Sequence, residues 1–241
     1  MSRWYGVCVL LLPFLSSCAQ TGGGSQSPDC ALEPGFVSIF DGETLGGWRS
    51  VPAENTSDWS VRDGAIVGSG SENRLVYLVW REEDLADFEL AFSYRMVTKG
   101  NSGVEIRSRV DASGKRPFEG YHADFGHIGI GDRVLGAWDF HFAQRTEHDC
   151  RRGTSLVIDK DEKGRRTKIE DALTLDDLSR GGWNHARVIA TDRHCKFFIN
   201  GKLASEFTDN YPEHLSSGMI GLQIHEAEME VAFKDLFIKR L

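Results

Sequence analysis

Two dipeptides that favour tight hairpin turns constrain the fold of this chain more than any other feature. Asp63-Gly64 lies between two apolar-alternating runs in WSVRDGAIVGS, and Asn200-Gly201 lies likewise in CKFFINGKLASEF. Both dipeptides tolerate the positive φ angles of a type I′ turn, so each predicts a β-hairpin. Similar alternation recurs along the chain, broken by turn residues about every ten residues. The sequence therefore predicts an all-β fold, either a sandwich or a jelly roll.

Helix and long loops are expected at few places. One or two helical turns are expected at 174–180, where Thr174 can act as a cap. The segment from about 140 to 182 carries many charges and a single possible strand, TSLVID. Long loops in compact domains are mostly binding loops or disordered segments. We therefore expect a loop-rich insertion in this part of an otherwise β-rich domain.

The first residues have the layout of an export signal. One Arg precedes an apolar run from about Gly6 to Leu15, and small residues follow. Leu15-Ser16-Ser17-Cys18 resembles a bacterial lipobox, in which Cys18 becomes the lipidated first residue; an ordinary secretory signal is the alternative. We expect residues 1–17 to be a signal peptide and 18–34 a flexible Gly/Ser-rich tether. The chain is thus expected to be an exported bacterial lipoprotein that lies at the outer membrane or faces the periplasm. It is expected to contact the membrane only through its lipid anchor.

Charge and cysteine content narrow the choice of partners. The formal net charge is −8 with a pI near 5.5, and no Lys/Arg block occurs, which argues against a nucleic-acid partner. An exported compartment permits disulfides, but Cys30, Cys150 and Cys195 can pair in more than one way. Because no Cys-x-x-Cys spacing occurs, a zinc site built on cysteines is not expected.

Three expected strands carry an apolar face and a face of titratable or amide groups. Alternate side chains of a strand share a face. In KGNSGVEIRSR this pairs Glu105 with Arg107; in GYHADFG and GLQIH it pairs the remaining polar residues, namely His122 with Asp124 and Gln223 with His225. If the strands are neighbours, these six residues gather on the concave side of one sheet as a sugar site. The alternative is an ordinary polar solvent face with a weak surface ion pair.

Other polar and aromatic residues lie outside this set of six. Asn101 and Ser102 can contact a ligand or satisfy the backbone of the turn that precedes the strand. Trp138 lies just before the insertion and is expected to line a cleft, where a flat ring can stack on a sugar. Tyr121 and the tryptophans at 48, 59 and 183 are expected to pack in the core. The histidines at 141, 148, 185, 194 and 214 are expected at the surface.

Several stretches resemble one family along the chain from residue 35 to 241, apart from the insertion. They are GFVSIFDGETLGGW, DFELAFSYRMVTKGNSGVEIRS, GYHADFG, GGWNHARVIATDRHCKFFINGK and IGLQIHEAEMEVAFKDLFIKRL. Together they resemble the 3-keto-disaccharide hydrolase domain. The resemblance implies a concanavalin A-like jelly-roll β-sandwich and the cleavage of glycosides that carry a ketone at C3. It also implies an oligosaccharide or glycoside substrate.

The chemistry of such a substrate suggests roles for the candidate residues. A C3 ketone acidifies the C2 proton, so a base can remove it and the C1 oxygen can depart by elimination, after which water adds to the enone. His122 or His225 suits the base, Glu105 or Asp124 the acid, and Arg107 the group that polarises the ketone. The sequence indicates no definite cofactor, and whether a metal takes part stays open, because His122, Asp124 and His225 together could hold a divalent cation such as Ca²⁺ or Mn²⁺.

Two other functions are compatible with the same fold. The first is a non-catalytic, lectin-like carbohydrate-binding module, which needs aromatic and amide groups more than titratable ones. The second is a conventional glycosidase, which needs two carboxylates flanking the scissile bond. Laminarinase-like glycosidases place these carboxylates in a Glu-x-Asp-x-x-Glu strand. That spacing does not occur here, because Glu105 is followed by Arg107 and Arg109. The titratable cluster therefore favours an enzyme that acts on 3-keto glycosides.

Overall fold

The computed structural model describes residues 33–81, 84–131 and 134–241, and Pro34–Leu241 forms one compact unit. The expected signal peptide, the lipidated Cys18, the tether and Cys30 lie outside the described residues. Within the described residues, no helix has the length and apolar composition needed to cross a membrane.

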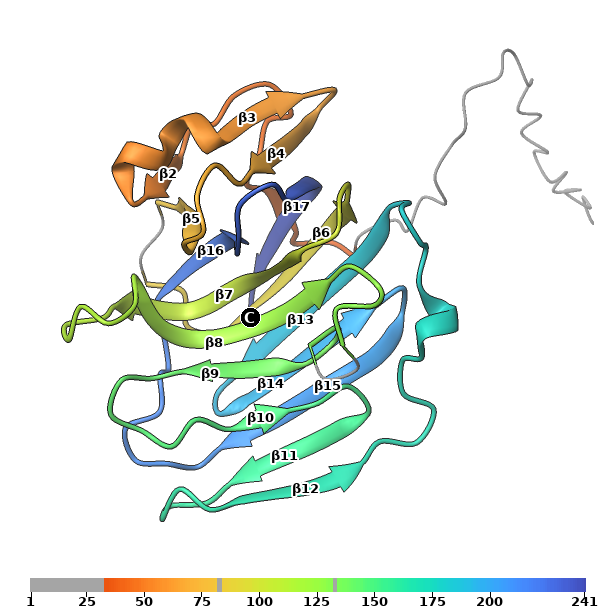
Figure 1. Cartoon of the computed structure of the whole chain (residues 1–241). Helices are drawn as coiled ribbons and strands as arrows, with labels where there is room; N and C mark the ends of the chain where they lie inside the picture. Colours follow the sequence, from red (N-terminus) through yellow and green to blue (C-terminus); the bar gives the residue numbers. More distant parts are fainter. Residues whose placement is uncertain (1–32, 82–83, 132–133) are drawn as a thin grey trace, which may run out of the picture. The chain divides into compact units, whose positions relative to one another are not determined.

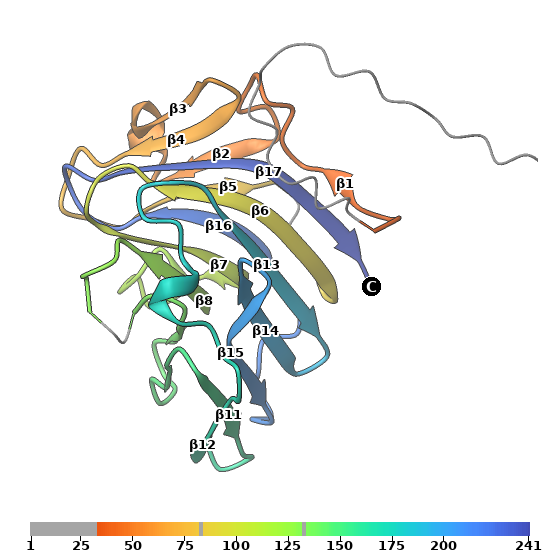
Figure 2. The same ribbon diagram turned by 90° about the vertical axis from the view of Figure 1, so that its right-hand side faces the viewer.

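The compact unit contains two β-sheets that enclose an apolar core (Figure 1). In order across the larger sheet, the strands are β12 (Gly164–Lys168), β11 (Thr154–Ile158), β15 (Lys202–Asp209), β14 (His194–Ile199), β13 (Asn184–Thr191), β6 (Phe88–Met96), β17 (Glu230–Arg240), β4 (Ala65–Ser69) and β3 (Trp59–Arg62). The short strand β1 (Val37–Ser38) also pairs with β17. Figure 2 shows β6 and β17 of this sheet running side by side.

The second sheet has seven strands within the described residues. In order they are β10 (Asp149–Cys150), β9 (Trp138–His141), β8 (Phe118–Gly126), β7 (Asn101–Val110), β16 (Met219–Ile224), β5 (Val76–Trp80) and β2 (Trp48–Val51). Two short 3-10 helices, η1 (Ala53–Asp58) and η2 (Leu175–Asp177), complete the described elements. The predicted all-β sandwich is confirmed.

Both predicted hairpins form with the expected turn conformation. Asp63 and Gly64 join β3 to β4 with φ angles of 51° and 74°, and Asn200 and Gly201 join β14 to β15 with φ angles of 49° and 80°. Positive φ at both central residues is the mark of a type I′ turn. The helical turn expected near Thr174 also forms, as η2, and the Asp177 carboxylate accepts hydrogen bonds from the N–H and hydroxyl of Thr174.

The segment from 140 to 182 is more regular than expected. It contains the antiparallel hairpin β11–β12, and β11 also pairs with β15 in parallel, which extends the larger sheet at its edge (Figure 1 and Figure 2). Arg145 ties the preceding loop to the sandwich through ion pairs with Asp209 and Glu162. The segment therefore contains more strands than the single one that the sequence predicted. Strand β12 was missed because its sequence is highly charged. Its five residues are all exposed at the edge of the sheet, so they show no apolar alternation.

The inner faces of the two sheets supply the core. Val104 and Ile106 of β7 and Tyr121, Ala123 and Phe125 of β8 all point inward and are buried, as the alternation predicts. Cys150 and Cys195 are also buried, and both are free thiols. Because alternate residues of a strand face opposite ways, the residues between these core positions lie on the outer face of the seven-stranded sheet.

Trp138 is part of this core, so the prediction that it lines a cleft was wrong. Its side chain is fully buried, and its ring packs edge-on against the rings of Phe197 and Phe207. The physical reason is strand parity, since β9 places Trp138 and Phe140 inward and Asp139 and His141 outward.

We predict that Trp138→Ala lowers the free energy of unfolding by about 3–5 kcal/mol, the usual cost of removing a buried aromatic ring. Chemical denaturation of the wild type and the variant gives the difference directly. Trp138→Phe should lose less, because it keeps part of the ring contacts. An unchanged unfolding midpoint for Trp138→Ala would contradict the buried position.

Candidate active site

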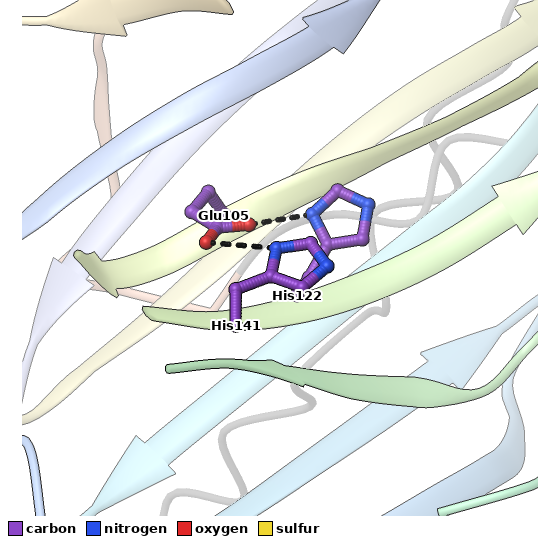
Figure 3. Close-up of side chains that lie close together, drawn as sticks. All are labelled: Glu105, His122 and His141. Atoms are coloured by element: carbon purple, nitrogen blue, oxygen red, sulfur yellow. Dashed lines mark hydrogen bonds and ion pairs between the residues drawn. The ribbon is translucent and has the colours of Figure 1, made fainter. Parts of the chain in front are cut away.

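Three neighbouring strands bring titratable side chains together on the outer face of the seven-stranded sheet. Glu105 of β7 lies opposite His122 of β8, and His122 lies opposite Asp139 of β9. His141, two residues beyond Asp139, lies on the same face. Figure 3 shows Glu105, His122 and His141 pointing toward one another. The register of the strands therefore builds the cluster.

Glu105 is the centre of this cluster. Its Oε2 lies 2.7 Å from Nδ1 of His122, and its Oε1 lies 3.3 Å from Nδ1 of His141 (Figure 3). The two imidazole rings stack at 5.0 Å between centroids with 24° between their planes. Glu105 and His122 are fully buried, whereas the side chain of His141 is 11% exposed. His141 is therefore the least buried member of this trio.

The charges of this cluster stabilise one another. Burial alone would raise the pKa of Glu105, but the charge of His141 and hydrogen bonds from both imidazoles lower that pKa to about 2. Burial alone would lower the pKa of His122, but the charge of Asp124 and the contact with Glu105 raise that pKa to about 10. These shifts run opposite to those that an acid at Glu105 and a base at His122 would need, which disfavours both predicted roles.

Two further carboxylates lie beside His122. Asp124 Oδ1 is 3.4 Å from Nε2 of His122, without the geometry of a hydrogen bond, and it accepts a hydrogen bond of 3.3 Å from Asn101 Nδ2. Burial and the charge of Asp124 raise the pKa of Asp139 to about 7. Glu105 and Asp124 are buried and Asp139 only partly so, which makes Asp139 the most accessible carboxylate of the cluster.

Three buried polar atoms of the predicted site residues have no hydrogen-bond partner: His122 Nε2, Asp124 Oδ2 and Gln223 Oε1. Gly103 lies opposite Asp124 in the strand register, and a Cβ at Gly103 would lie only 2.1 Å from His122 Nε2. Buried polar atoms are rarely left unpaired, so each such group calls for an explanation, such as a water molecule, an ion or a ligand. The glycine keeps this space open for the imidazole.

Arg107 does not share the face of Glu105, so that prediction was wrong. A bulge between Ile106 and Arg109 shifts the register of β7, and Arg107 itself has a φ of 47°. Its buried guanidinium donates to the backbone oxygens of Ala86 and Asp192 and pairs with Asp87 at 2.9 Å. Because the bulge reverses the direction of the side chain, Arg107 ties loops of the fold together and cannot polarise a ligand on the outer face.

The structure does not bring His225 to the cluster. Strand β16 ends at Ile224, and the exposed His225 pairs with Glu226 at 2.5 Å. The predicted cation set of His122, Asp124 and His225 therefore does not form.

The remaining predicted residues, Asn101, Ser102 and Gln223, differ in burial and in their hydrogen-bond partners. Asn101 bonds to Asp124 and is half-buried, whereas Ser102 is buried and donates to the Gln223 backbone oxygen at 2.7 Å. Gln223 is buried and donates from Nε2 to Tyr77 Oη at 3.0 Å. The predicted ligand contact of Ser102 is wrong, because its hydroxyl is turned into the fold. A direct ligand contact of Asn101 or Gln223 stays a prediction.

Asp139 and His141 were missed, and His141 was wrongly expected at the surface. The signal was present in AWDFHF, where Trp138 and Phe140 alternate with Asp139 and His141. This stretch is strand β9 of the sheet rather than the start of an insertion. Its period-two pattern would have placed both polar residues on one face.

Comparison with known proteins agrees with the fold and the sequence resemblance. Residues 35–239 match the family described as the 3-keto-alpha-glucoside-1,2-lyase-like domain. The chain belongs to this family. A stretch of 77 residues is 31% identical to a 3-keto-disaccharide hydrolase from Bacteroides thetaiotaomicron. This stretch covers 29% of the chain and 26% of that relative, so the match spans about a quarter of the relative's length.

Solved structures that resemble the chain share its fold at low sequence identity. A candidate glycosyl hydrolase from Parabacteroides distasonis has a TM-score of 0.57 and 19% identity, covering 86% of this chain and 94% of that one. The carbohydrate-binding module CBM66 from Bacillus subtilis has a TM-score of 0.53 and 14% identity, with coverages of 80% and 95%. The predicted jelly-roll sandwich is confirmed, and the family is one of carbohydrate-active proteins for which a saccharide is the expected ligand class.

We predict that Gly103→Ala disturbs the site, because the new Cβ would overlap the His122 ring and force it to move. Overpacking of this kind costs about 1–3 kcal/mol, which thermal or chemical unfolding measures. Gly221→Ala is the matched control, since a Cβ there would meet its nearest neighbour, Tyr77, at 3.5 Å. Equal stabilities of the two variants would contradict the close approach of His122 to Gly103.

Proposed function

We propose that the chain cleaves the C1–O bond of glycosides or disaccharides that carry a ketone at C3. The observation that carries this proposal is the buried acid–base cluster of Glu105, His122, Asp124, Asp139 and His141 on one face of the sheet. Family membership supports the substrate class. A surface that only binds sugars does not require buried charged side chains, because moving a charge out of water costs free energy.

The proposed reaction is an elimination that needs a base and a positive site. The base removes the proton from C2, and the electron pair moves toward the C3 oxygen as an enolate. The enolate then collapses to a C1–C2 double bond, the C1–O bond breaks, and the leaving oxygen takes a proton from water. Addition of water across the double bond completes net hydrolysis and gives the free 3-keto sugar. Among the charge changes in this reaction, the negative charge of the enolate is the one that most needs electrostatic stabilisation by the protein.

The geometry suggests which residues do this work. Asp139 is only partly buried and faces outward beside His122, so we assign it as the base that takes the C2 proton. His141, the least buried member of the Glu105–His122–His141 cluster, is the group that we assign to hydrogen-bond the C3 oxygen as the enolate forms. Asn101 donates a hydrogen bond to Asp124 and so positions that carboxylate beside the cluster. His225 lies outside the cluster and has no role in this mechanism, and export through a lipidated Cys18 stays a prediction.

We predict that Asp139→Asn lowers turnover of a 3-keto glycoside by at least about 10²-fold, the usual size of a general-base effect. Asp149→Asn is the matched control, because Asp149 lies opposite Asp139 on β10 but pairs with Arg151 and Arg166 at the surface. Initial rates measure both variants. A wild-type rate for Asp139→Asn would remove Asp139 from the mechanism, and an equal loss in Asp149→Asn would indicate a general fold effect.

We predict that a panel of 3-keto disaccharides releases free aglycone sugar when incubated with the protein, whereas the parent disaccharides do not. Chromatography of the products measures the release. Binding of 3-keto disaccharides without product would favour the alternative of a non-catalytic, lectin-like binding module, which the fold shared with CBM66 permits. Release from the parent sugars would instead indicate a conventional glycosidase.

A further inference from the structure

We propose that Glu105, His122 and His141 bind a divalent transition-metal cation. Each offers one ligand atom, a carboxylate oxygen or an imidazole nitrogen, and these atoms all lie within 4.8 Å of one another. Within residues 33–81, 84–131 and 134–241, this is the one group of three such side chains that meets this distance. The binding of a cation needs no assumption about the reaction, although it would add to the proposed chemistry.

The distances within the trio match those between neighbouring ligands of one cation. Nitrogen and oxygen ligands lie about 2.0–2.2 Å from a transition metal, so two ligands at tetrahedral or octahedral angles lie about 3 Å apart. The two contacts of the Glu105 carboxylate with the imidazole nitrogens are 2.7 and 3.3 Å. Both imidazoles therefore already present Nδ1 toward the same carboxylate at a suitable spacing.

The fold holds the three ligands in a fixed arrangement. They come from three adjacent strands, β7, β8 and β9, whose backbones are paired in register. The stacked imidazole rings limit the rotation of each other. Gly120 also keeps the space beside the carboxylate open, since a Cβ there would lie 2.9 Å from Glu105 Oε1. A site built on paired strands loses little conformational freedom when a cation binds.

Asp124 provides the second observation that favours a cation. A histidine that binds a metal through one ring nitrogen almost always directs its other N–H to a carboxylate or carbonyl, which fixes the tautomer. His122 Nε2 is buried, has no hydrogen bond, and lies 3.4 Å from Asp124 Oδ1. Asp124 in turn accepts from Asn101. This arrangement leaves Nδ1 of His122 as the nitrogen for the cation.

The local charge also suits a doubly charged ion. Two carboxylates, Glu105 and Asp124, flank the buried imidazole of His122. A divalent cation beside neutral imidazoles would balance both carboxylates.

The ligand types indicate which cations fit. Two imidazoles and one carboxylate suit Zn²⁺, Co²⁺, Ni²⁺, Fe²⁺ or Mn²⁺, whereas Ca²⁺ takes six to eight oxygen ligands. Three ligands from one side leave coordination positions open toward the exposed edge of His141. In the proposed reaction, a cation there would polarise the C3 ketone as a Lewis acid. The sequence-based suggestion of Ca²⁺ is therefore replaced by a transition metal held by a different set of residues.

The test is direct metal binding by the full domain after removal of any purification tag and dialysis against a chelator. Isothermal titration with Zn²⁺ and Co²⁺ should give one cation per chain, and bound Co²⁺ should show visible absorption bands. His141→Ala should weaken binding by more than about 100-fold, and Asp124→Asn by about 10–100-fold, as found for residues that orient metal ligands. His141 is partly exposed, so its variant should fold, which circular dichroism checks.

His194→Ala is the matched control, because His194 pairs with Glu206 at 3.0 Å without a third ligand and should bind cations as the wild type does. Absence of binding by the wild type, or wild-type affinity in His141→Ala, would overturn the proposal. These measurements use no sugar. A metal-binding protein that fails to cleave 3-keto glycosides would therefore count against the proposed function alone.

Discussion

The contact of 2.7 Å between Glu105 and His122 is the interaction on which the rest of the site depends. A buried carboxylate is costly unless a partner compensates it, and here His122 and His141 both do so. Asp124 approaches the far side of the same imidazole, so opposite charges alternate from Glu105 on β7 through His122 to Asp124 on β8. Removing His122 would leave the buried carboxylates of Glu105 and Asp124 without the imidazole that lies between them. The cluster therefore forms as a unit, and the register of β7, β8 and β9 determines its geometry.

Much of the fold could be predicted because its signals are local. The turns at Asp63-Gly64 and Asn200-Gly201 fix two hairpins through backbone conformation alone, and alternation in β7 and β8 places their core residues correctly. The same alternation failed at Arg107, because a bulge inserts one residue and reverses every face beyond it. Bulges depend on the partner strands, so period-two counting cannot detect them.

The candidate site was predicted in part for the same reasons. Glu105, His122 and Asp124 lie together as expected, since each belongs to an unbroken run of alternation next to a paired strand. His225 was lost because its strand ends one residue earlier, and His141 was missed because charged neighbours concealed a short strand. The alternation in AWDFHF could have placed His141, whereas the end of β16 depends on strand pairing that a single sequence does not encode locally.

The most direct measurement of the proposed chemistry is cleavage of a 3-keto disaccharide in D₂O, followed by NMR of the released 3-keto sugar. Elimination removes the C2 proton, and hydration of the enone then delivers deuterium from solvent to the same carbon. We predict full deuteration at C2 in the earliest product, above that of the free 3-keto sugar incubated without protein. A product that keeps its original C2 proton would contradict elimination and indicate direct displacement at C1.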